Sequence, residues 1–410
     1  MSQERRDFYK GQVYFTKALA YSELGRKWGN CPIIRDEVEY KPIGSSSWVE
    51  VIDYAIELAQ EAANLLPEYP NLTDYKGNAI TYKSTPSKGA AQALLAHLCA
   101  WKAGCKYMAQ PEEATYDERA LWVKADSVCT ALIMSGVYGL ANSPEKICTS
   151  TLVGGDPESI YEIVLRDCWD ELESEDPISV HDLSYCFGRY YQTWPVIPGE
   201  EAGDLWMRSW KILSTSVCKM YPQRIIGKDT ITDLRKDAYF YKVDSMANDT
   251  LLDITEGYAY PQKYRLTRLA TSGWQAGRFI NFDQNRIVFR LADIILLRAE
   301  CRVRLGNNEG AIADLNTIRE RADAELYNSS EYGGDLRYAI FKEREKELLM
   351  EGCRWYDVIR NGYYKTELYG GFRNVSEQDI LDGVFFNAVD DNEFSNNPLA
   401  RQTTYWLKRM

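Results

Sequence analysis

The sequence predicts a mostly α-helical protein: a scaffold of helical hairpins that carries an irregular, loop-rich elaboration. Two observations support this fold class. After Asn285, apolar and small residues recur every three or four positions, as on one face of a helix. Ala299, Gly306 and Ala311 have the spacing of a tetratricopeptide-type hairpin, in which small side chains let two helices pack closely. Between residues 148 and 285, by contrast, the periodicity fades.

In the N-terminal part, the sequence predicts helices over residues 5–27, 48–66, 87–105 and 117–135. Ser47 and Glu50 have the spacing of a capping box, in which each side chain bonds the other residue's backbone N–H. The second helix stops before Pro67, because proline cannot continue a helix. Ala18 and Gly25 repeat the seven-residue step between small residues, so the first two helices are also expected to pack closely.

The middle part predicts long loops with a few short strands. The run SIYEIVLRD alternates like a strand, with Ile160, Glu162 and Val164 on one face. The run TDLRKDAYFYKV is interpreted as another short strand. Loops of this length inside a compact domain are usually functional or flexible.

Aromatic residues are concentrated in these loops. They make up 13% of the chain, with 11 Trp and 29 Tyr, and Tyr185, Tyr190, Tyr191 and Trp194 fall within ten residues of one another. An aromatic ring can stack on the apolar face of a sugar, while polar groups bind its hydroxyls. We therefore expect a glycan-binding site made by Trp169, Tyr185, Arg189, Tyr190, Tyr191, Trp194 and Trp274. The alternative is that these rings form a small hydrophobic core under a long loop.

The C-terminal part predicts two helices separated at Gly306, followed by one long amphipathic helix that ends near Gly362. Ile340, Leu348, Trp355 and Ile359 are expected on or near one stripe of the long helix.

Acidic side chains on that long helix raise the alternative of an enzyme. Glycoside hydrolysis uses two carboxylates on opposite sides of the bond. Glu347 and Glu351 lie one turn apart, however, and would reach a sugar from the same side. We therefore predict that Glu347 and Arg354 are structural, partly buried and ion-paired.

Composition and residue spacing argue against nucleic-acid binding, a zinc site, a disulfide framework and a membrane-spanning segment. The net charge of −12 argues against nucleic acid, which needs a basic surface. His97 and His181 have no zinc spacing around them, and His97 is expected to be a satisfied core residue. The ten cysteines show no metal or disulfide pattern, and no apolar run is long enough to cross a membrane. No cofactor is expected.

Three runs together resemble the C-terminal signature of the SusD/RagB family: RLADIILLRAE, IFKEREKELLMEGCRWYDVIRNG and VFFNAVDDNEFSNNPLARQTTYW. The matching positions include Arg290, Asp293, Glu300, Arg344 and Asp357. The resemblance implies a surface lipoprotein of the Bacteroidetes outer membrane. Such a protein captures glycan without catalysis and passes it to a SusC-like TonB-dependent transporter in a polysaccharide utilisation system.

The resemblance also implies how the chain is divided. We expect one SusD-like domain over residues 1–410: N-terminal tetratricopeptide-like helices at 1–147, a ligand-face segment at 148–285, and C-terminal helices with a tail at 286–410. The start MSQERRDFYKGQ is charged and polar, unlike a secretion signal, so roughly a hundred residues and a lipid anchor are expected to precede it in a typical member. A glycoside-processing enzyme and a tetratricopeptide interaction scaffold remain the alternatives.

Overall fold

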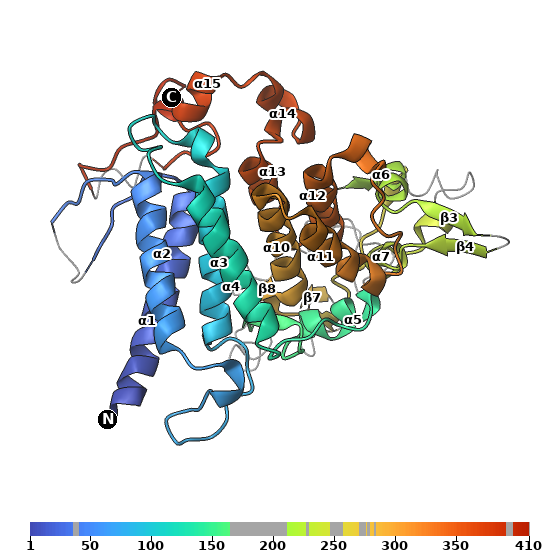
Figure 1. Ribbon diagram of the computed structural model, residues 1–410, viewed down its shortest axis with the longest axis horizontal. Coiled ribbons are helices and arrows are strands. Elements are labelled where there is room, and N and C mark those ends of the chain that lie inside the picture. Colours follow the sequence, from blue (N-terminus) through green and yellow to red (C-terminus); the bar gives the residue numbers. More distant parts are fainter. Residues whose placement is uncertain are drawn as a thin grey trace.

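Helices arranged side by side form the main body of the computed structural model (Figure 1). The structure describes residues 1–35, 41–164, 211–226, 229–246, 257–269, 276, 279–282, 284–390 and 397–409. Neighbours in the row pack in the order α1, α2, α3, α4, α10, α11, and α12 packs on α10. The predicted mostly α fold class is confirmed.

The N-terminal helices follow the sequence prediction closely. Their bounds are α1 Gln3–Lys27, α2 Trp48–Leu65, α3 Lys88–Gly104 and α4 Glu118–Met134. The predicted capping box is present: the Ser47 hydroxyl accepts from the Glu50 N–H at 3.3 Å, and Glu50 Oε2 accepts from the Ser47 N–H at 3.2 Å. Ser87 caps α3 in a similar way by accepting from the Ala90 N–H.

Small residues bring α1 and α2 together, as their spacing predicts. A Cβ atom added to Gly11 would lie 2.8 Å from Leu66 Cγ, and one added to Gly25 would lie 2.9 Å from Ile52 Cδ1. Ala18 is fully buried between them on α1. Larger side chains at these positions would therefore push the helices apart.

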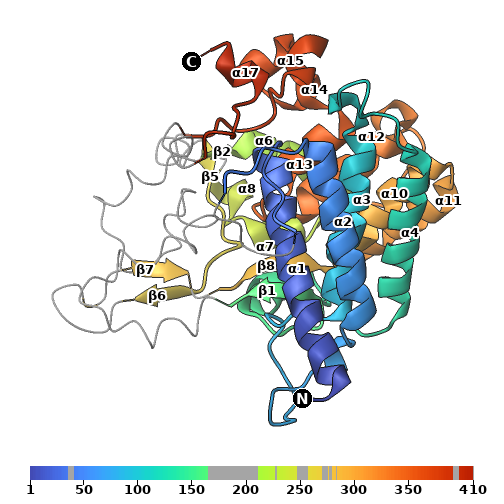
Figure 2. The ribbon, with the colours of Figure 1, turned by 90° about the vertical axis from the view of Figure 1, so that its left-hand side faces the viewer.

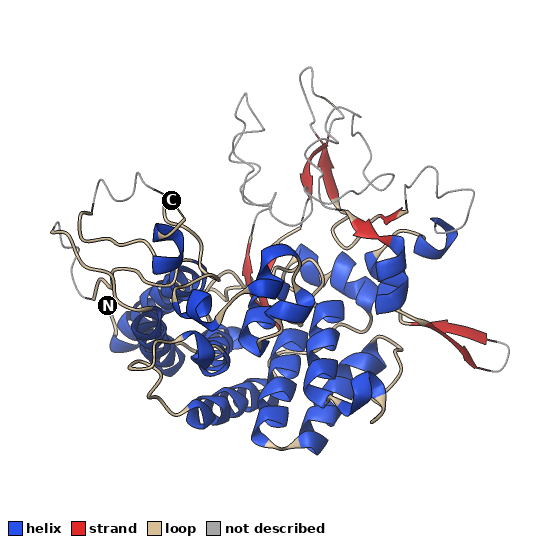
Figure 3. Cartoon of the chain, turned by 90° about the horizontal axis from the view of Figure 1, so that it is seen from above, coloured by secondary structure: helices blue, strands red, loops and turns tan. Residues whose placement is uncertain are grey.

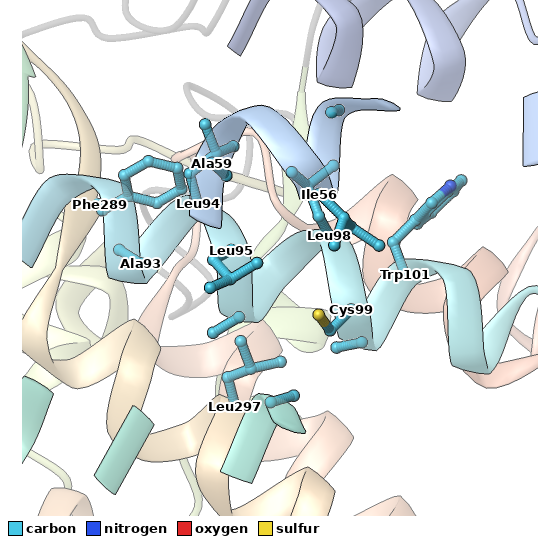
Figure 4. Close-up of a cluster of buried hydrophobic side chains, with 14 of the residues drawn as sticks. Ile56, Ala59, Ala93, Leu94, Leu95, Leu98, Cys99, Trp101, Phe289 and Leu297 are labelled. Atoms are coloured by element: carbon cyan, nitrogen blue, oxygen red, sulfur yellow. The ribbon is translucent and has the colours of Figure 1, made fainter. Parts of the chain in front are cut away.

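A continuous hydrophobic core runs through the helical row. Ile56 and Ala59 of α2 meet Leu94, Leu95 and Leu98 of α3, and Cys99 of α3 lies near Leu297 of α10 (Figure 4). The core extends from Phe8 near the N-terminus to Phe386 near the C-terminus. The N-terminal and C-terminal helices are thus parts of one packed scaffold.

The described middle part contains short elements. They are α5 Pro144–Thr149, β1 Ser159–Ile163, β2 Ile212–Leu213, α6 Ser214–Met220, β3 Gln223–Ile226, β4 Asp229–Thr232, α7 Arg235–Tyr239, α8 Val243–Met246, β5 Tyr258–Ala259, β6 Thr267–Leu269, β7 Phe279–Phe282 and β8 Arg286–Arg290. The strands form antiparallel pairs β1–β8, β2–β5, β3–β4 and β6–β7. Strand β1 confirms the prediction for SIYEIVLRD.

The predicted strand in TDLRKDAYFYKV is wrong. This run forms α7 and leads into α8, and the Lys236 carbonyl accepts from the Phe240 N–H at the end of α7. Tyr239 and Phe240 pack with Val217 and Tyr221 of the neighbouring segment in a small second core. Contacts from distant parts of the chain therefore override the local preference of aromatic residues for strands.

The C-terminal part begins with two helices, as predicted. The elements are α10 Leu291–Leu305, α11 Asn308–Arg321, α12 Leu336–Glu347, α13 Arg354–Asn361, α14 Tyr364–Glu367, α15 Glu377–Leu381 and α17 Thr404–Leu407. Gly306 ends α10 in the left-handed conformation at φ 87°. The tail packs over one end of the scaffold (Figure 2), where the Asn387 N–H donates to the Lys27 carbonyl at 2.7 Å.

The single long helix predicted between 336 and 362 is wrong, because the chain breaks between α12 and α13. Met350 and Gly352 have φ of 65° and 81°, which no helix contains. Lys263 Nζ donates to the carbonyls of Glu347 and Leu349, and Arg290 also donates to the Glu347 carbonyl. These cations satisfy carbonyls at the end of α12 and stabilise the break. Trp355, expected near the apolar stripe, is 36% exposed.

Candidate functional site

The predicted glycan-binding residues lie outside the part of the chain that the structure describes. They are Trp169, Tyr185, Arg189, Tyr190, Tyr191, Trp194 and Trp274. His181 lies outside it as well. The predicted site therefore stays a prediction. The described residues show what holds the two ends of each stretch of chain that carries the predicted residues.

β-strands lie at or next to the ends of the two stretches that carry the predicted residues. Residues 165–210 connect β1 to the residue before β2, and residues 270–278 connect β6 to β7. Strand β1 pairs with β8, which continues directly into α10, so its end is fixed to the scaffold. In the view from above, strands lie along the upper and right edges of the helical body (Figure 3).

Buried charged residues join the middle part to the scaffold. We call them the interior charge cluster, and its members are Glu158, Asp233, Arg235, Lys263, Arg290, Arg319, Arg321, Glu343, Glu347 and Glu351. Acids and bases are equal in number, so the set is neutral when every member is ionised. Burying charges is costly unless each one is paired and hydrogen-bonded.

Arg290 is the hub on the scaffold side. Its Nη1 donates to Glu158 and to Glu347, both at 2.7 Å, and its Nε donates to Glu351 at 2.8 Å. Arg321 Nη2 approaches the same Glu347 carboxylate at 2.5 Å. Three acids, one just before β1, one at the end of α12 and one in the break after α12, are thereby held around one guanidinium, the planar group best suited to carboxylate pairing.

Arg235 and Lys263 contribute from the middle part. Arg235 at the start of α7 forms ion pairs with Glu343 at 2.6 Å, Asp233 at 2.6 Å and Glu347 at 3.3 Å. Lys263, after β5, forms an ion pair with Glu351. The sequence did not single out Glu158, Arg235 or Lys263. Its one hint is the presence of charges inside the aromatic runs RKDAYFY and YPQKY.

The pairing keeps the acids of α12 ionised. Burial alone would raise the pKa of Glu343, but Arg235 and Arg319 hold that pKa at about 2. The pKa of Glu347 lies well below its usual value because Arg321 and Arg290 outweigh the effect of burial. An acid with so low a pKa is a poor proton donor near neutral pH. The geometry supports the structural interpretation of Glu347 and Glu351 over a catalytic one.

The predicted ion pairs of Glu347 and Arg354 are confirmed, but their burial differs from the prediction. Glu347 is fully buried rather than partly buried. The Arg354 side chain is 42% exposed and pairs with Glu345 at 2.6 Å and Glu367 at 3.0 Å.

His97 is a satisfied core residue, as predicted. Its Nε2 lies 2.7 Å from Asp293, and its ring stacks on Phe289 with centroids 5.4 Å apart. Asp293 also accepts from Arg344, which in turn pairs with Asp357. Within the described ranges, no three His, Cys, Asp or Glu residues gather as metal ligands, and the cysteines there are free thiols. No helix in these ranges is long and apolar enough to cross a membrane.

Comparison with known proteins identifies the family. The model of the SusD family matches residues 190–406, more than half of the chain. The chain belongs to the SusD family. SusD-like protein P38 of Formosa agariphila is 25% identical over 413 residues, which cover 94% of this chain and 72% of that protein.

Solved structures of SusD proteins have the same fold. A SusD homologue from Bacteroides thetaiotaomicron VPI-5482 matches with a TM-score of 0.73 and 22% identity, over 99% of this chain and 78% of that one. Surface glycan-binding protein A from Bacteroides uniformis matches with a TM-score of 0.64 and 17% identity, over 99% of this chain and 79% of that one. The interior charge cluster is therefore part of a SusD-type scaffold.

Proposed function

We propose that this SusD-family chain is a noncatalytic glycan-binding protein of the bacterial cell surface. It captures an oligosaccharide or polysaccharide and delivers it to a SusC-like TonB-dependent transporter of the outer membrane. Family membership carries this proposal, and the fold it shares with a surface glycan-binding protein supports it. Attachment through an N-terminal lipid anchor belongs to the same proposal.

The ligand face in this proposal is the middle segment, at 148–285. Trp169, Tyr185, Tyr190, Tyr191, Trp194 and Trp274 stack on sugar rings, and Arg189 binds hydroxyl groups. The described structure supports a fixed position for parts of this segment, because β1 near its start pairs with β8 and the interior charge cluster holds α7, inside the segment, against α12. A binding loop held at both ends loses less entropy when it orders around a ligand.

The ionised state of Glu343 and Glu347 in α12, and of Glu351 just after it, argues against the alternative of a glycoside-processing enzyme. Glu343, Glu347 and Glu351 are each paired with buried cations, which hold the pKa of all three carboxyl groups below its usual value. Glycoside hydrolysis needs one carboxylic acid that keeps its proton at working pH.

Retention and cleavage of labelled oligosaccharides separate the functions. A panel of plant, host and microbial glycans is incubated with the protein, and bound ligand and products are measured. We expect retention of at least one glycan without shorter products. Release of products would establish an enzyme, and neither retention nor cleavage across the panel would favour an interaction scaffold.

A further inference from the structure

A cavity of about 390 Å³ lies beside the interior charge cluster, whose members Asp233, Arg319 and Glu343 line it in part. Its walls come from the end of α6, the loop that follows α11, and the last turn of α12. This volume is within the range of sites that hold small organic ligands. Its lining includes Lys219, Asn328, Ser330, Glu331, Tyr332 and Lys346.

Lys346 brings an ammonium group to this cavity, near the carboxylates of Glu343 and Asp233. It forms no hydrogen bond or ion pair through its side chain with any residue that the structure describes. Its backbone is fixed, because its carbonyl accepts from the Tyr221 hydroxyl at 2.9 Å. Burial lowers the pKa of Lys346 against the attraction of Glu343, and the guanidinium groups of Arg235 and Arg319 lower that pKa further. Lys219 adds a second, exposed ammonium group.

The acids around the cavity are largely committed to other cations. Asp233 and Glu343 both pair with Arg235, and Glu331 pairs with Arg319 at 2.8 Å. Glu325 is exposed, so water screens its charge. An anionic group from outside would therefore find Lys346 available.

Tyr332 presents an aromatic ring in the same cavity. It is 41% exposed, and Tyr338 supports it edge-on with ring centroids 5.1 Å apart. Its φ of 50° is a left-handed conformation that bulky residues rarely adopt, and such strain concentrates at functional positions. Asn328 and Ser330 add amide and hydroxyl groups to the lining.

We propose that this cavity binds an acidic sugar residue, with its carboxylate on Lys346 and its ring against Tyr332. An aromatic ring, neutral hydrogen-bonding groups and the ammonium group of a half-buried lysine together match a pyranose that carries a carboxylate. Lys346 and Tyr332 lie outside the middle segment at 148–285, although Lys219 belongs to it. The site uses none of the aromatic residues of the proposed ligand face, so it does not depend on that proposal.

Calorimetric titration with D-galacturonic acid, D-galactose and acetate tests the site. We expect galacturonic acid to bind more tightly than galactose or acetate, because only the uronic acid offers both the ring and the carboxylate. Lys346→Gln should weaken galacturonic acid binding about tenfold or more, the range of a lost charge-assisted hydrogen bond. Tyr332→Gly should also weaken binding, while the melting temperature stays the same or rises because the strain is relieved.

Lys365→Gln and Tyr369→Ala are the matched controls, since both residues are exposed in the C-terminal tail. Both should bind galacturonic acid like the wild type. Equal affinities of wild type and Lys346→Gln, equal binding of galactose or acetate, or no binding of galacturonic acid at millimolar concentration would each overturn the proposal. These outcomes do not bear on the proposed ligand face, which responds to Tyr191→Ala instead.

Discussion

Glu347 accepts ion pairs from three arginines, of which Arg235 lies in the middle part and Arg290 and Arg321 lie in the scaffold. Glu347→Gln removes the negative charge and leaves buried guanidinium groups without compensation. We expect the free energy of unfolding to fall by about 3–5 kcal/mol, measured by chemical denaturation. The glycan affinity of the folded variant should equal that of the wild type.

Glu309→Gln is the matched control, because Glu309 is exposed on α11 and should leave stability nearly unchanged. Loss of a turnover activity in Glu347→Gln at unchanged stability would contradict the structural role.

The pKa values of the same acids predict the response to acid. The pKa of Glu343 is about 2 in the folded protein against an ordinary value of 4.5, and that of Glu347 is also lowered. A carboxylate with a lowered folded pKa stabilises the protein above its unfolded pKa, and this contribution is lost as pH falls through the folded value. We expect the free energy of unfolding to decrease from pH ~4.5 toward pH ~2.

Denaturation series at several pH values check this. The Glu343→Gln variant should be less stable near neutral pH and should show a shallower loss in acid. If the free energy of unfolding fell equally with pH in the variant and the wild type, other groups would cause the loss of stability in acid.

Tyr191 and Trp194 are the residues through which the proposed ligand face is best tested. Removing a stacking ring costs about 1–3 kcal/mol where bases stack on aromatic side chains, which corresponds to roughly five- to a hundred-fold in affinity. Tyr191→Ala and Trp194→Ala should weaken binding of a glycan found in the screen, with little change in melting temperature. Tyr369→Ala, at an 82% exposed ring in the tail, is the control. If Tyr191→Ala and Trp194→Ala both bound the glycan like the wild type and the control, the site would lie elsewhere.

At the scale of single elements, the sequence predicts the helices whose signals are local. The capping box at Ser47, the serine cap before α3 and the glycine after α10 all lie within a few residues of the helix ends that they set. The predicted bounds of α1 to α4 agree with the structure within one or two residues.

Elements that depend on distant charges could not be predicted. Helix α7 is stabilised by Arg235 pairing with Glu343 and Glu347, more than a hundred residues away. The break after α12 depends on Lys263 and Arg290, which bind its terminal carbonyls. Helical spacing showed that the α12 acids are ion-paired, but not which residues pair with them. The partners come from other elements, so periodicity carries no signal for them.

The close contact between α3 and α13 depends on a glycine, Gly104. A Cβ atom on Gly104 would lie 2.6 Å from the Arg360 backbone oxygen and 2.4 Å from its Cγ atom. Backbone cannot move aside cheaply, so Gly104→Ala should lower the free energy of unfolding by about 1–3 kcal/mol. Gly139→Ala is the control, because nothing lies within 4 Å of its added Cβ. Equal stability of both variants in denaturation would show that α13 shifts freely.

At the scale of the whole molecule, two kinds of contact unite the described parts. The main hydrophobic core joins the N-terminal and C-terminal helices, and the interior charge cluster joins α7 and Lys263 to α12. The second core, around Tyr221 and Tyr239, buries apolar surface in the middle part and touches Leu349 of the scaffold. Tyr264 of the middle part also packs with Ile287 and Met350 in a third apolar cluster. Charges therefore supply part of the connection between the middle part and the helical row.

This arrangement predicts that removing one charge separates the unfolding of the two parts. In the wild type, amides of α7 should exchange with solvent about as slowly as those of α3, because both open in the same cooperative event. Arg235→Met leaves Asp233, Glu343 and Glu347 without their shared partner, so α7 should open at a lower free energy while α3 stays protected. Native-state hydrogen exchange with mass spectrometry follows peptides from both helices.

Arg409→Met removes an exposed pair with Asp379 and should leave both exchange rates unchanged. If Arg235→Met accelerated exchange in α3 and α7 equally, the middle part and the scaffold would form one cooperative unit that does not depend on this charge. Selective exchange in α7 would instead identify Arg235 as the residue that fixes the middle part, which carries the proposed ligand face, to the helical scaffold.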